Sequence, residues 1–366
     1  MSQRTSFKFK ILKKSSKSLA RLGKLVTSHG GVLTPAFFPV GTQGTVKTMQ
    51  PKDLKRIGVQ GMLCNTYHLY LRPGPELIKK AGGLHKFISW DKPIISDSGG
   101  YQVFSIRDLK KITDRGVEFT SHIDGSKHFF TPEKVIKIQQ VFGSDIIVPL
   151  DEPVPHASSK KQVEKAVERT TDWARKAKKA YLHSPISSRR SQALFGIVQG
   201  GTYEDLRKKS AEEIRELGFP GYAIGGLSVG EPQDKMLDML EVQIPCLEEE
   251  KPKHLMGVGF AKDIIEAVKR GIDIFDCVIP TRLARHGSFL TMDGYTSIRL
   301  TKLKRHFKAI DPKCDCYACQ NFTAAYIRHL FMAREILAYA LLTTHNIRFM
   351  IRLMQKIRVD IRRGRI

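Results

Sequence analysis

Residues 194–226, LFGIVQGGTYEDLRKKSAEEIRELGFPGYAIGG, place a helical pattern between two short apolar runs. The first run, Leu194–Val198, is followed by Gln199 and two glycines, and the second, Tyr222–Ile224, is followed by another glycine pair. Within Tyr203–Leu217 the apolar residues fall on one face at helical spacing. Two short buried strands joined by a helix form a parallel βαβ unit. This stretch therefore predicts an α/β fold built on parallel strands.

The same alternation continues on both sides of this unit. Short apolar runs predict eight strands: Thr34–Pro39, Gly61–Cys64, Pro93–Ser96, Asp145–Leu150, Leu194–Val198, Tyr222–Ile224, His254–Val258 and Ile272–Phe275. Helical patterns lie between them: Pro51–Ile57, Glu76–Ala81, Pro132–Phe142, Lys160–Tyr181, Tyr203–Leu217, Gln233–Val242 and Ala261–Lys269. Eight alternating strands and helices over roughly 250 residues predict a (β/α)8 TIM barrel. A doubly wound open sheet is the alternative. Val117–Phe130 alternates around Asp124–Gly125 and predicts an inserted hairpin.

Charge is the strongest property of the whole chain. Its 366 residues include 61 lysines and arginines against 36 aspartates and glutamates, a formal net charge of +25. Such an excess predicts a polyanionic partner, typically nucleic acid. A solvated basic surface is the first alternative, and an anionic membrane surface is a weaker one. No apolar run approaches the ~20 residues of a membrane span, and no secretory signal pattern follows the basic start. We therefore expect a cytoplasmic protein with no membrane partner.

Three of the six cysteines crowd into six residues, at Cys314, Cys316 and Cys319. With His345 they supply a Cys3His set, which predicts one closed, structural Zn²⁺ site per chain. Ordinary thiols with a surface histidine are the alternative. Two further helical patterns, Asn321–Leu342 and Asn346–Arg363, surround this histidine. We expect residues 1–310 to form the barrel with an N-terminal extension, and residues 311–366 to form a zinc-binding helical subdomain packed on it.

Polar side chains follow the predicted strands at the points where the strands end. Asp97, Asp151, Gln199 and Asp276 each follow a different strand. Because the carboxyl ends of barrel strands meet at one rim, these side chains are expected to converge. A single aspartate in such a place is more often a helix N-cap. Three of them, each near glycines that allow a ligand to approach the backbone, indicate an active site.

Two carboxylates on one rim suit displacement at a sugar anomeric carbon. One acts as nucleophile, and the other moves protons on the leaving and entering groups. Asp151 and Gln199 then offer an acceptor and a donor–acceptor amide, which match the edge of a guanine-like base. Tyr101 offers an aromatic face for stacking. Together with the basic charge, this set predicts work on a nucleoside within RNA or DNA. A hydrolase of free nucleosides or sugars is the alternative.

Several ordered motifs resemble one known family. They are Ser96–Gln102, Gly196–Gly201, Gly225–Leu227, Phe275–Arg282 and the Cys3His set. Together they resemble the bacterial type of tRNA-guanine transglycosylase, also called queuine tRNA-ribosyltransferase, from about Thr34 onward. The resemblance implies a zinc-bearing (β/α)8 barrel, a pentosyltransferase, that works as a homodimer. It implies exchange of the wobble guanine of tRNAs with GUN anticodons for a 7-deazaguanine, in queuosine biosynthesis and without an energy cofactor.

The resemblance also implies a role for each matching residue. Asp276 corresponds to the nucleophile that forms a covalent bond with the RNA ribose, and Asp97 to the general acid and base. The residues implied to bind the base are Asp97, Ser98, Gly99, Gly100, Tyr101, Asp151, Gln199 and Gly226. Those implied to contact the anticodon loop are Gly257, Val258, Gly259, Phe260, Ala261, Lys262, Asp263, Thr281, Arg282, Leu283, Ala284 and Arg285. The basic tail, with Arg358 within it, is a further candidate for phosphate contacts.

Four positions leave the incoming base open. Pro153 stands where bacterial members commonly have cysteine, and Gly201 matches eukaryotic members that take queuine. Val229 keeps the bacterial pattern, and His286 replaces a common asparagine. The prequeuosine base preQ1 is the expected substrate, with queuine as the alternative. A non-catalytic, tRNA-binding subunit is a further alternative, which the presence of both Asp97 and Asp276 disfavours.

Overall fold

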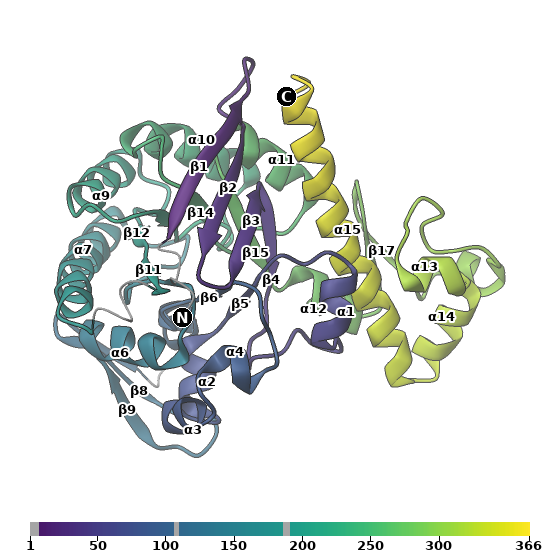
Figure 1. Cartoon of the computed structure of the whole chain (residues 1–366), viewed down its shortest axis with the longest axis horizontal. Coiled ribbons are helices and arrows are strands. Elements are labelled where there is room, and N and C mark those ends of the chain that lie inside the picture. Colours follow the sequence, from purple (N-terminus) through teal and green to yellow (C-terminus); the bar gives the residue numbers. More distant parts are fainter. Residues whose placement is uncertain (1–6, 106–109, 186–190) are drawn as a thin grey trace.

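The computed structural model describes residues 7–105, 110–185 and 191–366 (Figure 1). The fold is mixed α/β and contains two parallel sheets. One has the order β11-β10-β6-β5, and the other has the order β12-β13-β14-β15-β4. The strands are β4 (Ala36–Pro39), β5 (Met62–Cys64), β6 (Ile94–Ser96), β10 (Ile146–Ile147), β11 (Ala193–Leu194), β12 (Gly196–Val198), β13 (Tyr222–Ile224), β14 (Lys253–Leu255) and β15 (Ile274–Cys277). These short strands are buried throughout, which explains why most of their residues are apolar.

The two sheets adjoin at both of their outer strands. Val40, just after β4, forms a parallel bridge with Leu63 in β5. On the other side a single residue, Phe195, separates β11 from β12, and its N–H donates to the carbonyl oxygen of Ile147 at 2.9 Å. All eight predicted strands are thus present in outline. The stretch predicted as Asp145–Leu150 is shorter, because paired strand geometry covers only Ile146–Ile147.

Helices form an outer layer around these strands (Figure 1). They are α1 (Pro51–Arg56), α2 (Thr66–Leu71), α3 (Pro75–Lys80), α4 (Leu84–Phe87), α5 (Gly100–Ser105), α6 (Pro132–Phe142), α7 (Lys160–Leu182), α9 (Glu204–Glu216), α10 (Gln233–Gln243), η1 (Ile244–Cys246) and α11 (Ala261–Lys269). Local sequence explains both ends of α6. The Thr131 hydroxyl caps α6 by accepting from the N–H of Lys134, and Gly143 stops that helix in the left-handed conformation, with φ of 71°.

An antiparallel sheet at the start of the chain was not predicted. It consists of β1 (Lys8–Lys14), β2 (Arg21–Thr27) and β3 (Gly30–Thr34), in the order β1-β2-β3. The lysines of the outer strand β1 obscured its alternation, although charged side chains are common on an exposed sheet edge. The sheet lies at the amino-terminal ends of the parallel strands. There the guanidinium of Arg21 donates from Nε to Asp273 Oδ1 at 2.9 Å, just before β15.

The insertion between β6 and β10 is a three-stranded antiparallel sheet rather than a hairpin. Its strands are β7 (Lys110–Thr113), β8 (Gly116–Thr120) and β9 (Lys127–Phe130). The predicted hairpin corresponds to β8 and β9, whose turn contains Asp124 and Gly125. The additional strand β7 pairs with β8 through a tight turn at Gly116, where φ is 146°.

The last part of the chain contains α12 (Ile279–Arg285), β16 (Ser288–Thr291), β17 (Gly294–Ser297), η2 (Thr301–Arg305), α13 (Tyr317–Asn321), α14 (Ala324–Met332) and α15 (Ile336–Arg362). The two predicted helices were placed wrongly. The break falls at Arg334, which has φ of 61°, and α15 runs without a break through Thr343–Asn346. The sequence made that polar stretch resemble a loop. Three of its four side chains are instead buried, and Asn346 donates to the carbonyl oxygen of Pro280 at 2.9 Å.

Helix α15 connects three apolar cores, and its middle turns, with Ile347 and Ile351, belong to the core that contains Trp90. Its last turns, with Ile357 and Ile361, belong to the core that contains Phe37 of β4. Its first turns, with Leu341 and Leu342, belong to a separate core around the cysteine cluster. In Figure 1 this helix runs between the parallel strands and the α13–α14 region. Within the described residues, no helix is long and apolar enough to cross a membrane.

Candidate active site and metal centre

A cleft of about 500 Å³ lies at the carboxyl ends of the parallel strands. It brings together the four side chains that the sequence placed on one rim: Asp97, Asp151, Gln199 and Asp276. Each comes from a different strand or from the loop that follows it, so that the α/β arrangement alone explains their convergence. Ser98, Gly99, Tyr101, Gly226 and Gly257 line the same cleft. Tyr101 exposes 59% of its surface there, as a stacking face requires.

Asp97 lies on the turn after β6 and is held from two sides. Its Oδ1 accepts from the N–H groups of Thr66 at 2.9 Å and Gly99 at 3.2 Å, and its Oδ2 accepts from the Asn65 amide. Burial and, to a smaller extent, the negative charge of Asp276 raise the pKa of Asp97 to about 6, against the lowering effect of these hydrogen bonds. This carboxyl group can therefore gain or lose a proton near neutral pH.

Asp151 and Gln199 form a bonded pair within the cleft. The Gln199 Nε2 donates to Asp151 Oδ2 at 2.7 Å, and the Ser98 hydroxyl donates to Asp151 Oδ1 at 2.8 Å. Burial raises the pKa of Asp151 to about 6, against the lowering effect of these donors. The Gln199 Oε1 is buried with no hydrogen-bond partner among the described residues. A buried acceptor without a donor is costly, and an N–H group of a bound base would satisfy it.

The sequence predicted Asp276 just after a strand. In the structure it lies within that strand, β15. Its Oδ1 accepts from the Nε2 of His254 at 2.8 Å and more weakly from the N–H of Gly257 at 3.4 Å. The sequence analysis did not single out His254. The strand register explains the contact, because His254 pairs with Ile274, and the residue two positions further along β15 lies on the same face.

A buried arginine shapes the base side of the cleft and was also missed. Arg207 in α9 is inaccessible to solvent, and its guanidinium donates to three carbonyl oxygens: Gly201 at 2.7 Å, Gly225 at 2.8 Å and Gly226 at 2.9 Å. Burial lowers the pKa of Arg207 to about 9. The arginine thus joins the loops after β12 and β13. Gly226 has φ of 65°, which a residue with a side chain rarely adopts.

The residues implied to contact RNA divide into two groups. Four of them line the cleft: Gly257, Thr281, Arg282 and Arg285. Lys262, in α11, is exposed to solvent. Their neighbours are different. The side chains of Val258, Ala261 and Ala284 are buried in the apolar cores, and Gly259 packs against Cys277. Phe260, Asp263 and Leu283 are half-buried. Among the side chains, the two arginines are therefore the best placed to reach phosphates.

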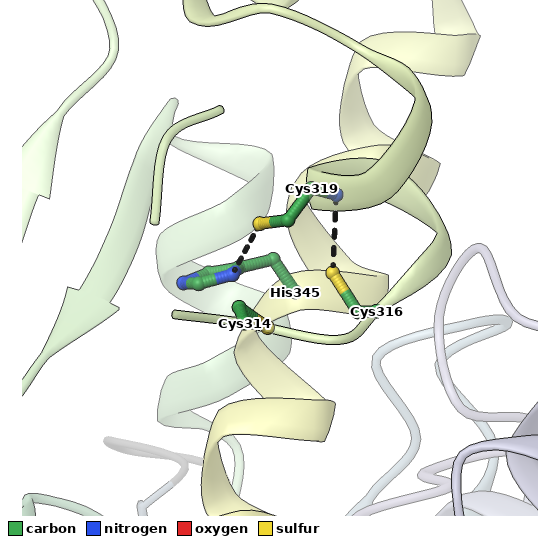
Figure 2. Close-up of side chains that lie close together, drawn as sticks. All are labelled: Cys314, Cys316, Cys319 and His345. Carbon is green, nitrogen blue, oxygen red and sulfur yellow. Dashed lines mark hydrogen bonds between the residues drawn. The ribbon is translucent and has the colours of Figure 1, made fainter. Parts of the chain in front are cut away.

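The metal ligands predicted from spacing lie together in Figure 2. The ligand atoms of Cys314, Cys316, Cys319 and His345 all lie within 4.8 Å of one another, and all four side chains are buried. Cys319 Sγ lies 3.3 Å from His345 Nδ1. His345 Nε2 lies 3.2 Å from the carbonyl oxygen of Leu290. If Nε2 carries the proton and donates there, Nδ1 is free to bind a metal. Three sulfurs and one imidazole fit a tetrahedral ion.

A second group of possible ligands lies at the opposite ends of the strands. His29 and His85 stack with ring centroids 3.5 Å apart, and both lie beside the carboxylate of Asp145. That carboxylate also accepts from the N–H groups of His29 at 3.2 Å and Ile94 at 2.9 Å. Burial opposes ionisation of Asp145, but the two histidines hold its pKa well below its usual range. The two rings are stacked only 13° from parallel, so their lone pairs point poorly at a common ion, and the contacts are those of two histidines packed beside a buried carboxylate.

Comparison with known proteins agrees with the site. The family model described as queuine tRNA-ribosyltransferase matches residues 15–366. A protein of that name from Thermoanaerobacter pseudethanolicus is 54% identical over 361 residues, which cover 99% of this chain and 95% of the relative. Another, from Aquifex aeolicus, is 54% identical over 369 residues, which cover 98% of this chain and 96% of the relative. The resemblance found in the motifs is confirmed. The chain belongs to the queuine tRNA-ribosyltransferase family.

Proposed function

We propose that this chain is a tRNA-guanine transglycosylase of the bacterial type. It exchanges the wobble guanine of tRNAs with GUN anticodons for preQ1, in the biosynthesis of queuosine. One observation carries this proposal. A nucleophilic carboxylate, Asp276, and a proton-exchanging carboxyl group, Asp97, line one cleft with the base-binding pair Asp151 and Gln199. Family membership supports the same activity, because the relatives bear that name.

The reaction runs in two displacements at C1′ of the ribose. In the first, an oxygen of Asp276 bonds to C1′ while the bond from C1′ to guanine N9 breaks, and the departing guanine takes a proton from Asp97. In the second, Asp97 takes the proton from N9 of the incoming base. That nitrogen bonds to C1′, and Asp276 leaves as a carboxylate. One glycosidic bond replaces another, so the exchange needs no energy cofactor.

The base pocket explains why guanine and a 7-deazaguanine can exchange. Asp151 accepts from N–H groups on the base edge, and the free Gln199 Oε1 accepts another. The main chain at Gly226, fixed by Arg207, borders the same pocket. Tyr101 stacks on the ring. Val229 also lines the cleft, where it limits space for the larger queuine. Queuine is the alternative substrate, favoured by Gly201.

The same proposal extends to the architecture and partners. The contacts that join both edges of the two sheets support a closed (β/α)8 barrel, formed with its N-terminal extension by residues 1–310. Residues 311–366 form a subdomain around one structural Zn²⁺, held by Cys314, Cys316, Cys319 and His345. When bound, the ion cross-links the α13 region to α15 and takes no part in the exchange. The partners are tRNA, guanine and the deazaguanine, and the enzyme works as a cytoplasmic homodimer.

The proposal is tested by trapping the covalent intermediate. Wild-type protein incubated with unmodified tRNA should give an RNA–protein adduct that survives denaturation, and Asp276→Asn should give none. Adding labelled preQ1 or labelled queuine to the adduct then identifies the base that enters. If only queuine is incorporated, queuine rather than preQ1 is the substrate. The absence of any adduct and of any incorporation with the wild type would overturn the proposed activity.

A further inference from the structure

His254 is the closest described hydrogen-bond donor to the side chain of Asp276. Its imidazole is fully buried, while the Asp276 side chain is about 10% exposed to the cleft. The two residues sit on neighbouring parallel strands, β14 and β15, which place them on the same face of the sheet. A histidine without solvent access, bonded at 2.8 Å to a reacting carboxylate, is not needed merely to fill the core.

The hydrogen bonds of the imidazole define which nitrogen carries the proton. Asp276 is an acceptor, so the 2.8 Å contact requires a proton on Nε2. The other nitrogen, Nδ1, is buried with no hydrogen-bond partner among the described residues. A proton on Nδ1 would leave a buried donor unsatisfied, which costs free energy. The geometry therefore makes His254 a donor to Asp276 through Nε2.

The two oxygens of Asp276 are held differently. Oδ1 accepts from His254 and, more weakly, from the N–H of Gly257, whereas Oδ2 has no hydrogen bond within the described part of the chain. A hydrogen bond to an ionised acceptor is among the stronger ones in proteins and fixes the orientation of the carboxylate plane. Nucleophilic attack needs an oxygen aligned with C1′ and free of other bonds.

We propose that His254 is a positioning residue for the nucleophile. It holds Asp276 through Oδ1, so that Oδ2 is the oxygen that bonds to C1′ of the ribose. After attack the ester has an alkyl oxygen at Oδ2 and a carbonyl oxygen at Oδ1, which continues to accept from His254. The second displacement returns the electron pair to Oδ2 as Asp276 leaves. This inference rests on the proposed transglycosylase activity.

The test measures the rate of covalent adduct formation in a single turnover with saturating tRNA. His254→Leu keeps a similar volume and removes the donor, whereas His254→Gln places an amide N–H near the position of Nε2. His254→Asn carries the same amide on a side chain too short to reach Oδ1. His85→Leu is the matched control, because it also removes a largely buried histidine beside a carboxylate, with Nε2 at 3.2 Å from Asp145, but at the opposite ends of the strands. Thermal melting confirms that each variant is folded.

A positioning role predicts a division between chemistry and binding. His254→Leu and His254→Asn should form adduct on the order of 10²-fold more slowly, with unchanged tRNA affinity, because a misplacement of about 1 Å has that effect. His254→Gln should recover most of the rate, and His85→Leu should retain all of it.

Two outcomes would overturn the inference: a wild-type rate in His254→Leu, or equal loss in the Gln and Asn variants. If His254→Leu does not fold, the comparison of Gln with Asn decides alone. Adduct formation by the wild type, together with its loss in Asp276→Asn, is measured in parallel. A failure of the wild type would therefore count against the proposed function, and not against the role of His254.

Discussion

At the scale of single residues, Asp97 combines deep burial with a nearby second carboxylate, and both raise its pKa, to about 6. We expect discharge of the isolated covalent adduct by the incoming base to accelerate as pH rises through 6 or slightly below. Asp97 must be ionised to accept the proton, and Asp276 carries no charge in the ester to oppose that ionisation. The measurement is the rate of base incorporation into purified adduct between pH 4.5 and pH 8.

Asp97→Asn provides the control for this prediction. It should discharge the adduct roughly 10²–10⁴-fold more slowly, since proton transfer by a positioned group contributes about that much. Its rate should also be independent of pH in the same range. A wild-type rate that falls as pH rises would assign the proton transfer to another group.

Asp151 gives a prediction about stability. Its raised pKa means that the folded protein binds this proton more tightly than the unfolded chain does. Its contribution to the free energy of unfolding is therefore fully present below about pH 4 and is lost as pH rises to about 6. At pH 8 the free energy of unfolding of Asp151→Asn should exceed that of the wild type by about 1–3 kcal/mol, and at pH 4 the two should be equal. Base exchange should be strongly impaired. Denaturant melts at the two pH values measure the difference.

Asp238→Asn is a suitable comparison, because this aspartate is half exposed on α10 and pairs with Lys235 at the surface. Its free energy of unfolding should change little at either pH. An Asp151→Asn protein that is less stable than the wild type at pH 8 would contradict the sign given above.

The residues that could be predicted are those whose type and place carry information together. Asp97, Asp151, Gln199 and Asp276 each stand where a predicted strand ends, and the cysteines have a metal-ligand spacing. His254 and Arg207 could not be found in that way. Each lies inside an element and acts through the neighbour that the fold brings to it, so that its role depends on registers and helix rotations that no local pattern specifies.

At the scale of elements, α15 carries the fourth residue of the proposed metal centre, His345, far from the three cysteines in sequence. Removing the metal with a chelator should loosen the core around α13 and α14 rather than the cleft. Cys316→Ala should lose the metal and lower Tm by roughly 10 °C, since several kcal/mol of binding free energy contribute to folding. Elemental analysis should find about one zinc per chain. Calorimetry with and without chelator measures the stability.

Cys246→Ala serves as the control, because Cys246 lies outside the cluster. It should keep its metal and nearly all of its stability. A metal-free protein with unchanged Tm would show that the four side chains are not a structural metal centre.

Some helices and strands could be predicted from the sequence, and others could not. The helix predicted over Ala261–Lys269 has those bounds in the structure, because its apolar face and its neighbours agree. The sheet formed by β1, β2 and β3 was missed, since an outer strand rich in lysine resembles a loop. The course of α15 was missed because its polar residues find buried partners, such as Pro280, that only the tertiary structure provides.

At the scale of the whole molecule, the basic residues have different roles, because some face the cleft and others bind the protein's own backbone. Arg282 and Arg285 line the cleft. Arg358 lies at the other ends of the strands, where it donates to the carbonyl oxygen of Pro35 at 2.6 Å and burial lowers its pKa to about 10. The expectation that this tail residue contacts RNA is therefore withdrawn. Replacing Arg282 and Arg285 by alanine should reduce the log–log salt slope of tRNA binding by about 1.4, at roughly 0.7 per phosphate.

Arg358→Ala is the control for that measurement. It should keep the wild-type salt slope and lose some thermal stability, because the half-buried carbonyl group of Pro35 loses its donor. Binding titrations at three or more salt concentrations compare the variants. An unchanged slope in the double variant would mean that phosphates are held elsewhere on the protein.

The position of α15 has a consequence for how the protein is made. Leu22 and Phe37 are among the first core residues to leave the ribosome, and Ile357 and Ile361, which share their core, are translated only after every other helix. Growing chains therefore carry an uncovered apolar surface for most of their synthesis, and such surface promotes aggregation. We expect nascent chains to depend on chaperones until α15 emerges, and ribosomes stalled before it to release products that proteases remove.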